Sequence, residues 1–166
     1  MNAVYQRLLK QKESQEKLAL AYEKITSYEM AYISLWIILE KTLKDIDTKL
    51  KRDKLYSQVS EWKQYLEIKS NDSKKPKEIR SFNLKESERI PELGNIEEYL
   101  GNIPITKEIM NTQTKHGSTK WRDKRNNIAH KAESFGKKET YCIYRDKILG
   151  GVNEVAKLLA EAGPNE

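Results

Sequence analysis

An arginine, Arg125, and a histidine, His130, are separated by four residues in this chain. These two side chains are the groups that cleavage of RNA without a metal ion requires. A neutral imidazole, whose ordinary pKa is about 6.5, moves a proton to or from a ribose hydroxyl near neutral pH. A guanidinium forms two hydrogen bonds to the phosphoryl oxygens on which charge accumulates. The pair therefore predicts proton transfer by His130 and phosphate stabilisation by Arg125.

The spacing of this pair also bears on how a site could be built from it. On one helix, five positions set the two side chains about 140° apart around the axis and about 7.5 Å apart along it. They do not share one narrow face, whereas two such helices packed about a two-fold axis would assemble a fuller site. Because two-fold dimers are the commonest oligomers, we expect a homodimer through this helix. The sequence leaves open whether His130 acts as base or acid.

Three neighbouring residues have two interpretations each. Asn126 is a candidate polar helper that orients the phosphate or Arg125, and the alternative is that it caps a helix or faces solvent. Trp121 could stack on a base, but its helical spacing to other apolar residues favours packing in the core or in a dimer interface. Glu40 could pair with a cation of the motif, or it could be an ordinary exposed carboxylate at a helix edge.

Positive charge is concentrated around the Arg–His pair. The chain has 31 Lys and Arg against 25 Asp and Glu, which gives a net charge of +6. The stretch of residues 115–147 has ten basic and four acidic residues, so it accounts for the whole excess. This balance predicts a polyanionic partner such as RNA. Four basic side chains are candidate phosphate contacts: Lys120, Arg122, Lys124 and Lys131. As phosphate contacts they would raise the affinity for RNA and its salt dependence without specifying a base sequence. The alternative is that they form only a solvated helix face.

The hydrophobic spacing predicts an all-α chain. Charged residues make up 34% of it, and only seven Gly and four Pro are present, which favours long solvated helices over β hairpins. Between residues 79 and 114, Pro and Gly limit the chain to short helices. Apolar positions three and four residues apart predict longer amphipathic helices, the second of them central, over residues 4–25, 28–50, 55–66 and 141–159.

A short helix is expected to carry the Arg–His pair. Thr119 is the candidate N-cap, the helix runs to about Ser134, and Gly136 closes it. In the last helix, Gly150 and Gly151 cost about 1 kcal/mol each relative to Ala. Two glycines at such positions indicate a kink or a close helix contact rather than a phosphate-binding loop.

Length and composition narrow the class of protein. A chain of 166 residues fits one domain over residues 1–166. Cys142 is the single cysteine and only two histidines are present, so we expect no disulfide, no metal and no other cofactor. No apolar run approaches the roughly 18 residues of a membrane span, and the polar residues 1–17 lack a signal-peptide pattern. We expect a cytoplasmic protein without a membrane partner.

Taken together, these residues resemble the HEPN domain family. Its nuclease members carry an Arg-x4-6-His motif on a late helix of an all-α bundle, and Arg125 to His130 match that motif. Asn126 after the Arg and Ala129 before the His also resemble many members. The long second helix and the final helix after Gly136 lie where the family's bundle would have them.

The resemblance implies a HEPN-like, up-and-down bundle of about five main helices. It implies a metal-independent endoribonuclease that works as a homodimer, with both motifs lining the interface. The products would carry 2′,3′-cyclic phosphate and 5′-hydroxyl ends. The implied roles are those of a toxin or an antiviral-defence effector, with a cognate antitoxin or regulatory protein as a further partner. The alternative is a non-catalytic HEPN-type adaptor that binds RNA or a protein.

Overall fold

The computed structural model describes residues 3–68, 93–110 and 119–162. Within them the chain is all-helical, which confirms the predicted all-α class. No helix in these ranges is both long enough and apolar enough to span a bilayer. The helices are α1 (Ala3–Lys24), α2 (Tyr28–Ile68), α4 (Leu93–Leu100), α5 (Pro104–Met110), α6 (Lys120–Lys131) and α7 (Lys138–Glu161).

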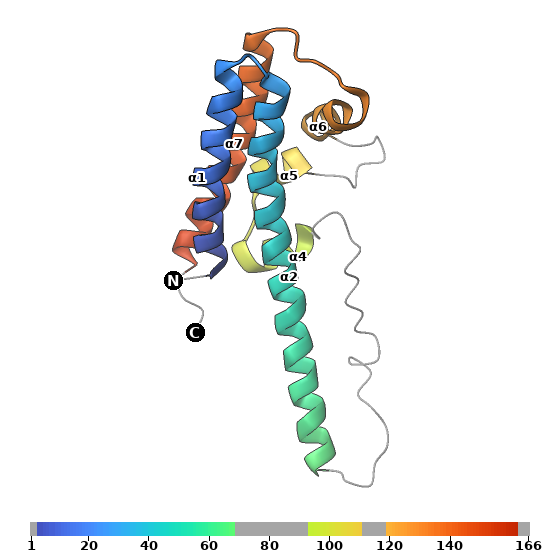
Figure 1. The fold of residues 1–166 in the computed structure, drawn as a ribbon. Coiled ribbons are helices and arrows are strands. Elements are labelled where there is room, and N and C mark those ends of the chain that lie inside the picture. The colour runs from blue at the N-terminus through green and yellow to red at the C-terminus, as the bar shows by residue number, and fades with distance from the viewer. Residues whose placement is uncertain (1–2, 69–92, 111–118, 163–166) are drawn as a thin grey trace.

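The body of the bundle consists of α1, the first half of α2, and α7 (Figure 1). Helix α2 is central, as its apolar composition predicts, since it contacts α1, α4, α6 and α7. Leu39 and Leu43 of α2 are completely buried, as are Ile148 and Val152 of α7. Each such side chain contributes about 1.5–3 kcal/mol by leaving water. This shared apolar core fixes the α2 face against which the smaller helices pack.

The prediction of separate helices over residues 28–50 and 55–66 is wrong, because α2 is one continuous helix. The intervening residues are all compatible with a helix, and none is Gly or Pro. An ion pair spans the expected break: Nζ of Lys49 lies 2.5 Å from Oδ2 of Asp53, one turn later. The second half of α2 extends well beyond the bundle in Figure 1.

The other predicted helices are found with small changes of length. Helix α1 matches the prediction for residues 4–25, and α7 extends the one for residues 141–159 by three residues at the front. Helices α4 and α5 are the short helices expected between residues 79 and 114. Residues 79–92 and 111–114 of that region lie outside the described residues.

Helix α7 approaches α5 closely at its two glycines, so a close helix contact is the one found of the two predicted alternatives, a kink or a close contact. A Cβ added to Gly151 would lie 2.8 Å from Cδ1 of Ile109, and one added to Gly150 would lie 3.0 Å from Cδ1 of Ile105. The backbone of α5 in turn holds the start of α6, because Oγ1 of Thr119 donates a hydrogen bond to the Ile109 carbonyl at 2.6 Å. The glycines therefore support the position of the motif helix.

Replacing Gly151 with Leu should lower the free energy of unfolding by about 2 kcal/mol, because the added side chain overpacks the α5–α7 contact. Gly94→Leu is the matched control, since no atom lies within 4 Å of a Cβ at that position. Urea unfolding followed by circular dichroism measures both variants. Equal stabilities of the two variants would contradict the proposed close contact.

Candidate functional site

Helix α6 begins as the sequence predicts, and its first turn is anchored to the core. Oγ1 of Thr119 accepts a hydrogen bond from the backbone N–H of Arg122 at 3.3 Å, which is the expected N-cap. Trp121 is buried, and its ring lies 4.9 Å from that of Tyr144 between centroids. Core packing is therefore the correct interpretation of Trp121, and base stacking is not available to it.

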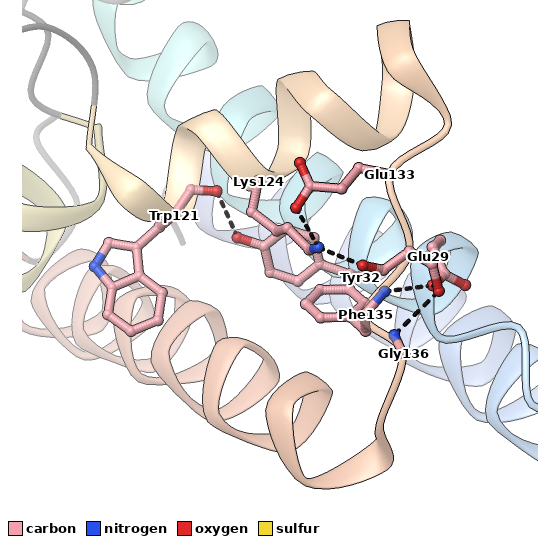
Figure 2. Close-up of polar contacts among 8 residues, drawn as sticks. Glu29, Tyr32, Trp121, Lys124, Glu133, Phe135 and Gly136 are labelled. Carbon is pink, nitrogen blue, oxygen red and sulfur yellow. Dashed lines mark hydrogen bonds and ion pairs between the residues drawn. The ribbon is translucent and has the colours of Figure 1, made fainter.

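A buried tyrosine of α2, Tyr32, holds the first turn of α6 against the core. Oη of Tyr32 donates a hydrogen bond to the Trp121 carbonyl at 2.8 Å (Figure 2). Burial raises the pKa of Tyr32 above its ordinary value, so the hydroxyl stays protonated and remains a donor. The bond ties the first turn of α6 to α2 and joins residues 89 positions apart in the chain.

Lys124 is the clearest correction to the predicted RNA contacts. Its side chain is only 9% exposed, and its Nζ lies 2.6 Å from Oε1 of Glu133 and 2.7 Å from the Ser134 carbonyl oxygen (Figure 2). The ammonium also lies 4.6 Å from the centroid of the Phe135 ring. A buried cation needs such partners because burial removes its hydration. Lys124 is therefore a structural residue and not part of a solvated phosphate-binding face.

The same contacts end α6 earlier than predicted. The helix stops at Lys131 rather than near Ser134, and Ala132 has the left-handed φ of 53° at the C-cap. The backbone after it bonds elsewhere: the Ser134 carbonyl accepts from Lys124, and the Phe135 N–H donates to Oε1 of Glu29 at 2.7 Å. These groups are engaged outside the helix, so the helix does not continue through them.

Glu29 holds the loop between α6 and α7 against the start of α2. Its Oε1 accepts hydrogen bonds from the Phe135 N–H (Figure 2) and from the Ser134 hydroxyl, both at 2.7 Å. Burial alone would raise the pKa of Glu29, but the hydrogen bonds from Phe135 and Ser134 outweigh it and lower the pKa below its ordinary value of 4.5. The ionised carboxylate is thus the form that orders the loop.

Arg125 points toward α2 and is held there by a carboxylate. Its Nη2 lies 3.0 Å from Oε2 of Glu40, and its Nη1 donates to Oδ1 of Asn126, also at 3.0 Å. The same Glu40 oxygen accepts from Nε1 of Trp36 at 3.0 Å. Glu40 therefore pairs with the motif arginine, and Asn126 orients that arginine, so these two interpretations are the correct ones. Arg125 remains 30% exposed, so a ligand has access to it.

Arg122 belongs to the same group of charges. Partial burial lowers its pKa; the Glu40 carboxylate raises it, and the neighbouring Arg125 guanidinium lowers it again. The Asp123 carboxylate raises the pKa of Arg122 as well. Two guanidinium groups and two carboxylates thus lie close together where α6 meets α2.

His130 lies on the exposed side of α6, away from Arg125. This agrees with the predicted angular separation, so one α6 does not bring both motif side chains onto one face. Asn126 is one turn before His130, and residues four apart are neighbours on a helix surface. Asn126, which accepts a hydrogen bond from Arg125, therefore lies next to His130 on the surface of α6. Among the described residues, no hydrogen-bond partner engages the imidazole of His130.

The remaining predicted phosphate contacts differ in what surrounds them. Lys120 and Lys131 are exposed, and Nζ of Lys120 lies 4.4 Å from the Trp121 ring centroid. Other cations of residues 115–147 are paired with acids from distant helices: Arg145 with Glu23 of α1, and Lys147 with Glu108 of α5. The positive excess of this stretch in sequence is therefore partly neutralised in three dimensions.

Sequence reasoning missed the roles of Glu29 and Tyr32. Each contacts a residue far away in the chain: the separation is 106 residues for Glu29 to Phe135 and 89 for Tyr32 to Trp121. No local pattern signals such a contact. The only available hint was that a polar group on the most apolar helix needs a partner when it is buried.

Comparison with models of known protein families, with curated protein sequences and with solved structures found no match. In the described ranges, no three His, Cys, Asp or Glu side chains form a group that could hold a metal ion. Fold and site together define an all-α bundle in which one helix, α6, carries an arginine paired with a carboxylate of α2 and, on its exposed side, a histidine.

Replacing Glu29 with Gln should destabilise the protein at pH 7, and this difference should disappear in acid. Because the folded state lowers the pKa of Glu29, its contribution is complete above pH 4.5 and is lost as the pH falls through the lowered pKa. Urea unfolding of wild type and variant between pH 7 and pH 3 measures the difference. The control is Glu98→Gln at an exposed carboxylate. A difference between wild type and Glu29→Gln that is independent of pH would contradict this assignment.

Proposed function

We propose that this protein is a metal-independent endoribonuclease of the HEPN type that acts as a homodimer. The observation that carries the proposal is the orientation of Arg125 by Glu40 and Asn126 on a helix whose solvent face bears His130. A guanidinium held in this way is available to a phosphate without reordering of its long side chain. The resemblance of the Arg–His motif to that family agrees with this chemistry.

The proposed reaction uses only groups of the RNA and of the protein. The ribose 2′-hydroxyl loses its proton, and its oxygen attacks the adjacent phosphorus. The bond from phosphorus to the 5′-oxygen breaks, and that oxygen takes up a proton. The products are a 2′,3′-cyclic phosphate and a 5′-hydroxyl. His130 transfers one of the two protons, and Arg125 stabilises the charge on the phosphoryl oxygens.

A second copy of the chain supplies what one α6 lacks. Arg125 and His130 point to different sides of their helix, so one protomer offers a phosphate-binding cation and a proton carrier that are separated. Two α6 helices related by a two-fold axis bring each histidine toward the arginine of the other copy. In such a dimer one His130 acts as base and its symmetry mate as acid, and both proton transfers are accounted for.

The His130→Ala variant should lose RNA cleavage while keeping its stability, because the imidazole is exposed and makes no contact that the fold requires. Wild type and variant are incubated in EDTA with a mixed pool of tRNA and mRNA, and the fragment ends are identified chemically. The expected result is cyclic-phosphate ends from the wild type and a loss of at least about 10²-fold in rate for the variant.

The chain's other histidine provides the matched control, and His116→Ala should cleave as the wild type does. Thermal unfolding verifies that all three proteins are folded. If the folded wild type binds RNA and leaves it intact, the nuclease proposal is wrong, and the non-catalytic adaptor becomes the better account of the same surface.

Glu40 is a positioning residue in this scheme, since it acts through Arg125. Glu40→Gln keeps an oxygen acceptor for Arg125 and Trp36 but removes the charge that aligns the guanidinium. We expect kcat to fall about tenfold, because a loosened catalytic group loses alignment. KM should not rise, since the variant has one negative charge fewer near the RNA. Single-turnover and steady-state kinetics separate the two parameters, and Glu139→Gln controls for the charge change alone. A rise in KM with unchanged kcat would contradict the positioning role.

A further inference from the structure

A second concentration of positive charge lies outside residues 115–147, in a groove between α1 and α2. The α1–α2 groove has a volume of about 580 Å³. Leu8 and Thr42, which are 2% and 4% exposed, form its floor. Both helices contribute cations to its walls: Arg7 and Lys10 come from α1, and Lys41 and Lys44 come from α2.

The charge of this groove is largely unneutralised. Among the described residues that line it, Asp45 is the one carboxylate, and it pairs with Arg7 through a contact of 2.9 Å from Nε to Oδ2. Lys10, Lys41 and Lys44 are exposed, and within the described part of the chain none of them forms an ion pair. Several basic residues near the Arg–His motif are, by contrast, paired with acids of other helices. The α1–α2 groove is therefore a stronger anion attractor than the local sequence suggests.

We propose that the α1–α2 groove binds the phosphate backbone of a single RNA strand that continues from Arg125. This inference rests on the proposed ribonuclease function and extends it to the way in which the substrate is held. Three unpaired lysines on opposite walls suit successive phosphates of a flexible strand. None of the described residues that line the groove is aromatic, so they offer no platform for stacking bases, and binding there should not depend on base identity.

The groove adjoins the proposed catalytic centre along α2. Lys44 lies four residues after Glu40, the partner of Arg125, and residues four apart are neighbours on one helix surface. Lys41 follows Glu40 directly and faces the groove. A strand that leaves Arg125 would thus cross the exposed surface of α2 at Lys44 and enter the groove beside Lys41.

A phosphate backbone fits this groove better than an acidic protein does. Protein interfaces depend mainly on large apolar or aromatic anchors that are buried on binding. The one such residue in the lining is Leu8, which is already buried in the floor and cannot enter a partner. The groove therefore offers charge and hydrogen-bonding groups, which is what a polyanion requires.

The test measures binding separately from cleavage. The probe is a single-stranded 2′-O-methyl RNA of about 16 nucleotides, whose blocked hydroxyl prevents cleavage and whose length spans the groove. The groove variant is Lys10→Gln with Lys41→Gln and Lys44→Gln. The matched control removes the same charge at exposed lysines elsewhere, by Lys54→Gln with Lys63→Gln and Lys157→Gln. Fluorescence anisotropy gives the affinity of each protein over a range of salt concentrations.

The groove variant should bind about tenfold more weakly near physiological salt, with a salt slope reduced by about 2, because three phosphate contacts are lost. The control should stay within twofold of wild type. Thermal unfolding verifies that the groove variant is folded.

The outcomes distinguish this inference from the proposed function. Equal loss of affinity in both triple variants, or no loss in either, overturns the groove as a binding site, even if the wild type cleaves RNA. Selective loss in the groove variant supports the groove, and it does so even if no RNA is cut. Failure of the wild type to bind the probe at all overturns the inference outright.

Discussion

The buried ammonium of Lys124 is the interaction on which the candidate site depends. A cation at this depth is stable only with a close anion and a carbonyl, and Glu133 and Ser134 supply both. To do so, the chain after Lys131 must turn back over α6, with Ala132 in a left-handed conformation. Lys124 thereby sets where the motif helix ends and leaves His130 in its last turn.

Two contacts from α2 complete this arrangement. Tyr32 bonds the first turn of α6 through the Trp121 carbonyl, and Glu29 bonds the loop that follows the helix. Both ends of the motif region are thus tied to one rigid helix of the core. The buried face of α6 packs against the core, and the exposed face between the two anchored ends does not. Asn126 and His130 are therefore available to a ligand.

Charge in this protein is distributed by the fold rather than by the order of residues. The stretch of residues 115–147 has the entire net charge of +6, yet Arg125 and Lys124 are paired with carboxylates. The rest of the chain is neutral in sum, yet α1 and α2 gather Lys10, Lys41 and Lys44 around one groove. Coulombic fields depend on distance in space, so a count along the sequence misjudges both surfaces.

The sequence by itself determined the all-α class, the central second helix and the N-cap at Thr119, because each depends on local spacing or on one residue's side chain. It left a kink or a close helix contact open at Gly151, and the packing of α5 against α7 decided for the contact. It misjudged the break in α2, where local composition permits a continuous helix. Only the tertiary structure decided that Lys124 is buried, that Glu40 holds Arg125 and that Glu29 orders the loop. Those contacts join residues that are distant in the chain. They form only once α6 packs on α2, because burial then removes the charged groups from water and makes close pairing necessary.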